Sequence, residues 1–96
     1  METIDRKFRI LAVNPANGHI YTDKDALLLC AKDAAVPAAL RCYLAECAKL
    51  GANPEHLQSV SLLLQRVEAY QLVVDARIPD TVGQAELDRC LRGIGV

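Results

Sequence analysis

The sequence predicts an α+β fold in which an N-terminal β-hairpin packs on a three- to four-helix, mostly antiparallel helical domain. Alternating apolar and polar residues flank the turn-forming string NPANG near the N-terminus. A long stretch beginning at Asn53 repeats apolar residues at steps of three and four, which indicates a helix. The 96 residues fit one domain, in which residues 1–5 are frayed, 6–22 form the hairpin and 23–92 form the helical part.

The hairpin is predicted to run from Arg6 to Thr22. Arg6 to Val13 reads as the first strand, and His19 to Thr22 returns antiparallel to it. In the connection, Asn14 and Pro15 favour a type I turn, and Gly18 can adopt the positive φ that closes the loop. Because a two-stranded hairpin is only marginally stable alone, we expect it to lie against the helices.

Two helices are expected between the hairpin and the GAN connection. Thr22 and Asp25 form a short variant of a capping box, which predicts a first helix from Asp23 to about Ala34. Its centre, ALLLCA, is apolar on nearly every side and should be buried. Pro37 ends that helix and opens a second one, which runs to Leu50 and is capped by Gly51.

The longest predicted helix spans Asn53 to about Val74. Asn53 is a good N-cap, and Pro54 suits the first helical position. The short GAN connection pairs this helix antiparallel with the preceding one. A loop from Asp75 to Gly83 leads to a last helix over Gln84 to Leu91, after which Gly93 and Gly95 release the terminus. The broad apolar face of the helix over Asn53 to Val74 comprises Leu57, Val60, Leu64, Val67 and Val74, with Leu63 and Tyr70 alongside.

Four apolar residues lie on the other side of this long helix, where the edge of a monomer should be polar. Two explanations remain open. The hairpin and first helix could sandwich the long helix, or the stripe could be a homodimer or partner interface. The interface candidates are Leu62, Ala69, Leu72 and Val73.

Charge and composition argue against several classes of protein without excluding nucleic-acid binding. Eleven basic and 12 acidic residues give a net charge of −1, which disfavours nucleic acid as a partner. No apolar run is long enough for a membrane span and the N-terminus lacks a signal-peptide pattern, so a cytoplasmic location is expected. None of Cys30, Cys42, Cys47 and Cys90 belongs to a CxxC pair, which predicts buried or half-buried free thiols and no metal site.

No stretch carries a catalytic or phosphate-binding motif, so neither catalytic residues nor a cofactor are predicted. His19 lies near Tyr21 and two aspartates, where it is a general base, a pH-sensitive contact or an exposed strand residue. The basic cluster of Arg6, Lys7 and Arg9 is a solvated strand face, a contact for an acidic protein or small molecule, or, least favoured, a nucleic-acid contact.

These observations predict a non-enzymatic protein–protein interaction or regulatory module that forms a homo-oligomer. The alternative is a small-ligand-binding or sequestering protein with a polar pocket between hairpin and helices. Candidate ligand or partner contacts are Arg9, His19, Tyr21 and Lys24.

Three strings, VNPANGHIYT, DALLLCAKD and LGANPEH, are similar to small uncharacterised proteins encoded by bacteriophages and prophages. The resemblance covers about half of the chain. It implies a bacterial cytoplasm and action on a host or phage component, and it assigns no role to any residue.

Overall fold

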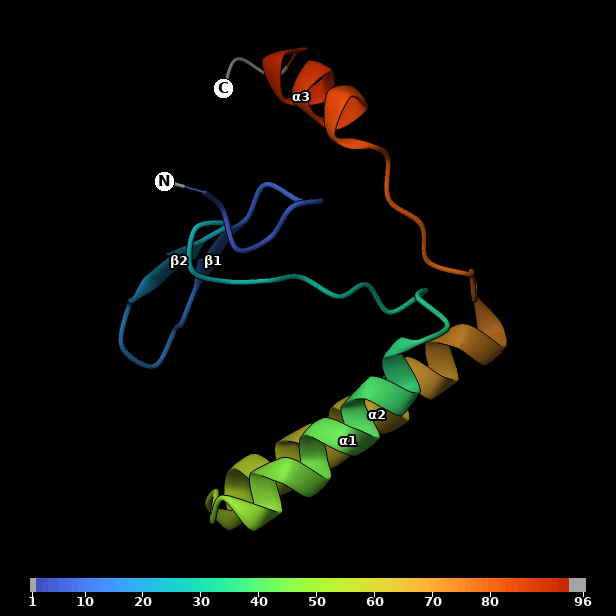
Figure 1. Ribbon diagram of the computed structural model, residues 1–96. Helices are drawn as coiled ribbons and strands as arrows, with labels where there is room; N and C mark the ends of the chain where they lie inside the picture. Colours follow the sequence, from blue (N-terminus) through green and yellow to red (C-terminus); the bar gives the residue numbers. More distant parts are fainter. Residues whose placement is uncertain (1, 94–96) are drawn as a thin grey trace. The chain divides into compact units, whose positions relative to one another are not determined.

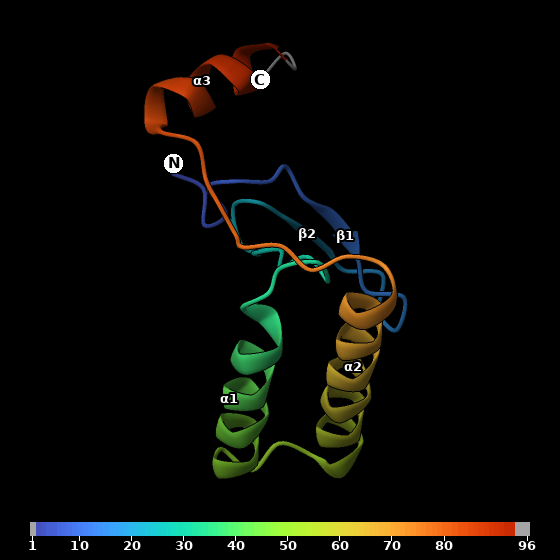
Figure 2. The ribbon, with the colours of Figure 1, turned by 90° about the vertical axis from the view of Figure 1, so that its right-hand side faces the viewer.

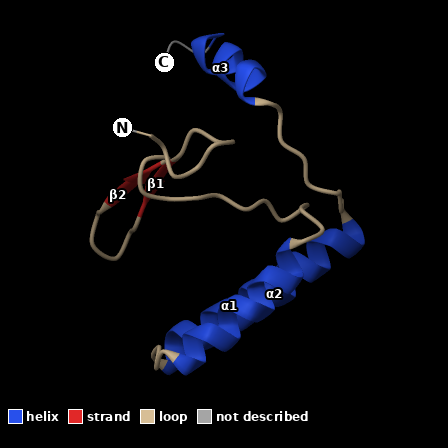
Figure 3. Ribbon diagram, viewed as in Figure 1, coloured by secondary structure: helices blue, strands red, loops and turns tan. Residues whose placement is uncertain are grey.

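The computed structural model describes residues 2–93 and has an antiparallel two-stranded hairpin followed by three helices. The predicted α+β fold is therefore confirmed (Figure 1). The chain divides into two compact units, Met1–Leu28 with Asp80–Val96, and Leu29–Pro79. Long irregular segments connect the regular elements (Figure 3). These elements are β1 (Leu11–Val13), β2 (Ile20–Thr22), α1 (Val36–Lys49), α2 (Pro54–Val73) and α3 (Gln84–Gly93).

The β-hairpin forms around the predicted turn. Val13 pairs with Ile20, and the amide of Gly18 donates to the carbonyl of Asn14 at 2.7 Å. Gly18 has a φ of +73°, the left-handed conformation that glycine adopts without strain. The Asn14 side chain also accepts from the Ala16 amide at 2.9 Å. The turn chemistry in the sequence therefore sets the register of the hairpin.

The first strand is shorter than the predicted Arg6 to Val13. Two amides of that stretch, those of Lys7 and Phe8, donate to the Asp5 carboxylate at 2.8 and 2.7 Å. An amide committed to a side chain cannot join a β-ladder, so the paired strand begins only at Leu11.

The N-terminal segment is ordered closer to the start of the chain than expected. We predicted that residues 1–5 would be frayed. Met1 lies outside the described residues, but the amides of Ile4 and Asp5 donate to the Asp23 carbonyl at 2.9 and 3.0 Å. Asp5 and Asp23 are both buried. Gly95, which we expected to release the C-terminus, lies outside the described residues.

The helix predicted from Asp23 to Ala34 is not formed, and this prediction was wrong. Thr22 and Asp25 make the expected mutual contact, because the Thr22 amide donates to Asp25 Oδ1 at 2.9 Å, but the contact closes a turn. Beyond it, the Leu28 amide donates to the Asp5 carboxylate at 2.8 Å. Tertiary partners thus take a backbone group that a helix would have used, and Leu27, Leu28 and Leu29 remain exposed.

Helices α1 and α2 form the predicted antiparallel hairpin and lie side by side (Figure 2). Gly51 ends α1 with a φ of +80°, and the Asn53 side chain caps α2 by accepting from the His56 amide at 2.8 Å. The seam between the helices is thin, because only two residues of each are buried. They are Val36 and Cys47 of α1, and Val60 and Val67 of α2.

Gln71 joins the C-terminal part of α2 to the segment that precedes α1. Its side-chain amide donates to the carbonyls of Ala31 and Asp33 at 2.9 and 2.7 Å. Next to it, the Arg77 amide donates to the Lys32 carbonyl at 2.7 Å, and Asp33 forms an isolated parallel bridge with Arg77. These bonds hold residues 31–34 in turns around the bridge residue Asp33, an arrangement that a helix over 23–34 would exclude.

We expect Asn53→Ala to destabilise the helical hairpin by about 1 kcal/mol, since it removes the side-chain acceptor of the His56 amide at the start of α2. Thermal unfolding followed by circular dichroism measures this loss. Gln58→Ala is the matched control, because Gln58 is exposed on the same helix and makes no capping contact. Equal melting temperatures for the two variants would contradict the assigned cap.

Candidate functional site

The first unit contains a pocket of about 640 Å³. The N-terminal segment supplies most of its wall, with Glu2, Thr3 and every residue from Asp5 to Arg9. Asp23, which follows β2, and two residues of α3, Gln84 and Leu87, complete it. Three cationic side chains therefore line one small space, at a volume typical of ligand sites in proteins.

The Asp5 carboxylate organises this wall. Its Oδ1 accepts from the amides of Lys7 and Phe8, and its Oδ2 accepts from that of Leu28. Burial alone would raise the pKa of Asp5, but these three amides and the charge of Lys7 outweigh it, and the pKa lies below the ordinary value of 3.8. Asp5 is thus a charged carboxylate engaged by the backbone.

The three basic residues differ in their partners. Lys7 Nζ donates to the Asp80 carbonyl at 2.6 Å and lies 3.7 Å from the Asp80 carboxylate. Arg6 donates to the side-chain oxygen of Gln84, a neutral acceptor. Among the residues that the structure describes, neither Arg6 nor Arg9 forms an ion pair, so both guanidinium groups keep their charge uncompensated.

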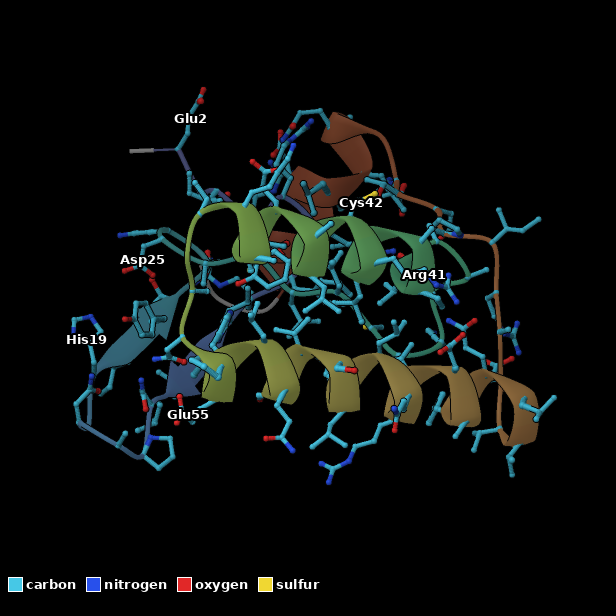
Figure 4. The ribbon with its side chains drawn as sticks, turned by 90° about the horizontal axis from the view of Figure 1, so that it is seen from below. Glu2, His19, Asp25, Arg41, Cys42 and Glu55 are labelled. Carbon is cyan, nitrogen blue, oxygen red and sulfur yellow. The ribbon has the colours of Figure 1, made fainter. Side chains whose placement is uncertain are left out.

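The predicted ligand contacts do not form one site. Arg9 lines the pocket, whereas His19, Tyr21 and Lys24 are not part of its wall. The rings of His19 and Tyr21 pack on the hairpin with their centroids 4.4 Å apart, and His19 projects from the hairpin in Figure 4. The sequence pattern indicated the cluster of Arg6, Lys7 and Arg9. It could not indicate Gln84 and Leu87, because no local pattern links α3 to the N-terminal segment.

The helical hairpin has two chemically different sides. On one side, Arg41 of α1 pairs with Glu68 of α2 at 2.6 Å, and Figure 4 shows Arg41 on α1. Tyr43 lies two residues after Arg41, roughly 200° around the helix, and its hydroxyl lies 3.4 Å from His56 Nε2 of α2. The side marked by Tyr43 and His56 is therefore opposite to the ion pair.

Apolar side chains continue along the Tyr43 side of α2. Leu63 and Tyr70 follow His56 at steps of seven, so they lie in line with it, and Leu62 and Val73 extend the surface toward the outer face of α2. Their exposed fractions are 51% for Tyr43, 43% for Leu62, 48% for Leu63, 38% for Tyr70 and 80% for Val73. We call these five residues the apolar flank.

The four predicted interface candidates are all exposed. Leu62 and Val73 belong to the apolar flank, while Ala69 and Leu72 lie beside them on the outer face of α2. The first helix, which could have covered them, is not formed. Leu63 and Tyr70, which we assigned to the core-facing side, are instead partly exposed, because the seam with α1 covers a narrower arc than the apolar face of α2 occupies.

The cysteines are free thiols, as expected, but they differ in exposure. Cys47 is buried and Cys30 half-buried, whereas Cys42 and Cys90 are exposed, which the prediction of buried or half-buried thiols missed. The neighbouring Cys47 thiol raises the pKa of the Tyr43 hydroxyl.

Within residues 2–93, no three histidine, cysteine or acidic side chains gather in a way that could hold a metal ion. No helix in the described part of the chain is both long and apolar enough to cross a membrane. Comparisons with protein-family models, curated proteins and solved structures found no match to this chain.

We expect Asp5 to make the first unit sensitive to acid. Because its pKa is lowered in the folded state, its stabilising contribution is present above pH 3.8 and is lost as the pH falls through the folded-state pKa. Asp5→Asn should therefore unfold more easily than the wild type at about pH 7, and this difference should shrink toward about pH 2. Denaturant unfolding at both values measures it. A difference that stays constant with pH would show that the charge of Asp5 does not contribute.

Proposed function

We propose that this chain is a non-enzymatic interaction module of the cytoplasm whose helical hairpin pairs with a second copy of the same chain. The apolar flank is the observation that supports it. Its members are apolar, partly or largely exposed, and lie on one side of the α1–α2 hairpin, where the exposed Arg66 lies among them. Soluble proteins rarely leave such a surface in water unless it binds something.

The width of the apolar face on α2 favours a bundle of four helices. The seam residues Leu57, Val60, Leu64 and Val67 follow a strict alternation of steps of three and four, which one facing helix can cover. Leu63 and Tyr70 add a third position per heptad. About three apolar positions in seven is the pattern of helices in larger bundles, which two copies of the hairpin would form.

The charge of the chain does not oppose self-association. The net charge of −1 creates little repulsion between copies.

The predicted resemblance to phage-encoded proteins is consistent with such a module acting on a host or phage component. A second candidate function, the binding of a small ligand, is supported by the pocket in the first unit.

We expect Leu63→Glu to convert the dimer into a monomer, with a dissociation constant raised by at least about a hundredfold, because two carboxylates would be brought into one apolar interface. Analytical ultracentrifugation over a concentration series measures this change. Leu62→Glu should weaken the dimer in the same direction, since Leu62 belongs to the same surface.

Ala48→Glu is the matched control. Ala48 is exposed two turns after Arg41, on the side of α1 that carries the ion pair with Glu68, and it receives the same charge. This variant should dimerise like the wild type. A wild-type chain that remains monomeric at high concentration, or equal effects of Leu63→Glu and Ala48→Glu, would overturn the proposal. Circular dichroism confirms that each variant keeps its helices.

A further inference from the structure

We propose that the pocket of the first unit binds a small organic anion, with Arg6 and Arg9 holding its phosphate or carboxylate group and Phe8 and Leu87 contacting its apolar part. The pocket belongs to a different unit from the helical hairpin. The inference is therefore independent of self-association.

The balance of available charge in the pocket is positive, although its wall contains three acidic and three basic residues. Asp5 is buried and its two oxygens already accept three backbone amides. Asp23 is also buried, and its carboxylate accepts from the Ile10 amide at 3.3 Å. Glu2 is the remaining acid and is exposed near the N-terminus, as Figure 4 shows. The pocket wall therefore combines one exposed carboxylate with two arginines that form no ion pair in the described part of the chain.

A hydrogen-bond chain from α3 orients Arg6. The Gln84 side chain accepts from the Arg6 guanidinium and donates to the Asp88 carboxylate at 2.7 Å. A guanidinium carries five N–H donors, so the bond to Gln84 leaves several for a ligand. Because its planar group matches the oxygens of carboxylate and phosphate, arginine suits such a ligand better than lysine does. Gln84 is accordingly a positioning residue.

The apolar part of the wall indicates that the ligand is more than an inorganic ion. Phe8 is half-buried, and Lys7 Nζ lies 5.6 Å from the centre of its ring, so one face of the ring is already occupied by a cation. Leu87 of α3 is buried and borders the same pocket. A volume of about 640 Å³ exceeds what a phosphate ion fills and accommodates an attached ring or short chain.

The test is a nuclear magnetic resonance titration of the full chain with inorganic phosphate, phenyl phosphate and benzoate. We expect saturable shifts of the Lys7 and Phe8 amides with phenyl phosphate or benzoate, and weaker binding of inorganic phosphate because it lacks the apolar contact. Whichever of phenyl phosphate and benzoate binds more tightly identifies the anionic group that the site prefers. Arg9→Gln should weaken its binding by about tenfold or more, since one charge-assisted hydrogen bond is lost.

Four further variants distinguish a built site from general attraction of anions. Glu2→Gln should tighten binding because it removes the one exposed carboxylate from the wall. Gln84→Ala should weaken it, and Gln84→Glu should weaken it further by pairing with Arg6. Arg66→Gln, which removes the same charge from the exposed surface of α2, should leave affinity unchanged. No saturable shift with either aromatic probe, or equal losses for Arg66→Gln and Arg9→Gln, would overturn the inference.

Discussion

The Asp5 carboxylate is the interaction on which the first unit depends. A buried charge is costly unless its oxygens are satisfied, and three backbone amides satisfy those of Asp5. Two of the amides come from the next turn of chain, and the third comes from Leu28, beyond the hairpin. The Asp5 side chain thereby shapes the loop that carries Arg6 and Arg9. It also joins the segment before the hairpin to the segment after it. The short strands alone could not do this.

The sequence predicted those elements whose stabilising contacts are local. The NPANG turn, the Asn53 cap and the Gly51 terminus each depend on residues within one turn, and all three form as expected. The predicted helix over 23–34 failed for the opposite reason. Its apolar residues and capping pair suit a helix, but Asp5, Gln71 and Arg77 lie far away in sequence and take its backbone groups. Long-range hydrogen bonds of this kind leave no periodic signal.

The candidate surfaces were also predictable only in part. Leu62 and Val73 could be identified because apolar residues on the outer side of a long helix contradict the expected amphipathic pattern. Leu63 and Tyr70 could not be, since a helical wheel gives the direction of a side chain but not the width of the arc that its neighbour covers. For the pocket, the basic cluster was visible in the sequence, whereas its closure by Gln84 depends on a contact across most of the chain.

The composition of the first unit also affects the order of folding. The α1–α2 hairpin joins helices through a short connection, so it can form as soon as residues 36–73 have left the ribosome. The first unit instead combines the N-terminal segment with α3, and Arg6 and Gln84 are 78 positions apart. It cannot be completed until α3 has been synthesised. Until then, Arg6 and the rest of the pocket wall lack the Gln84 and Leu87 side chains that complete the pocket.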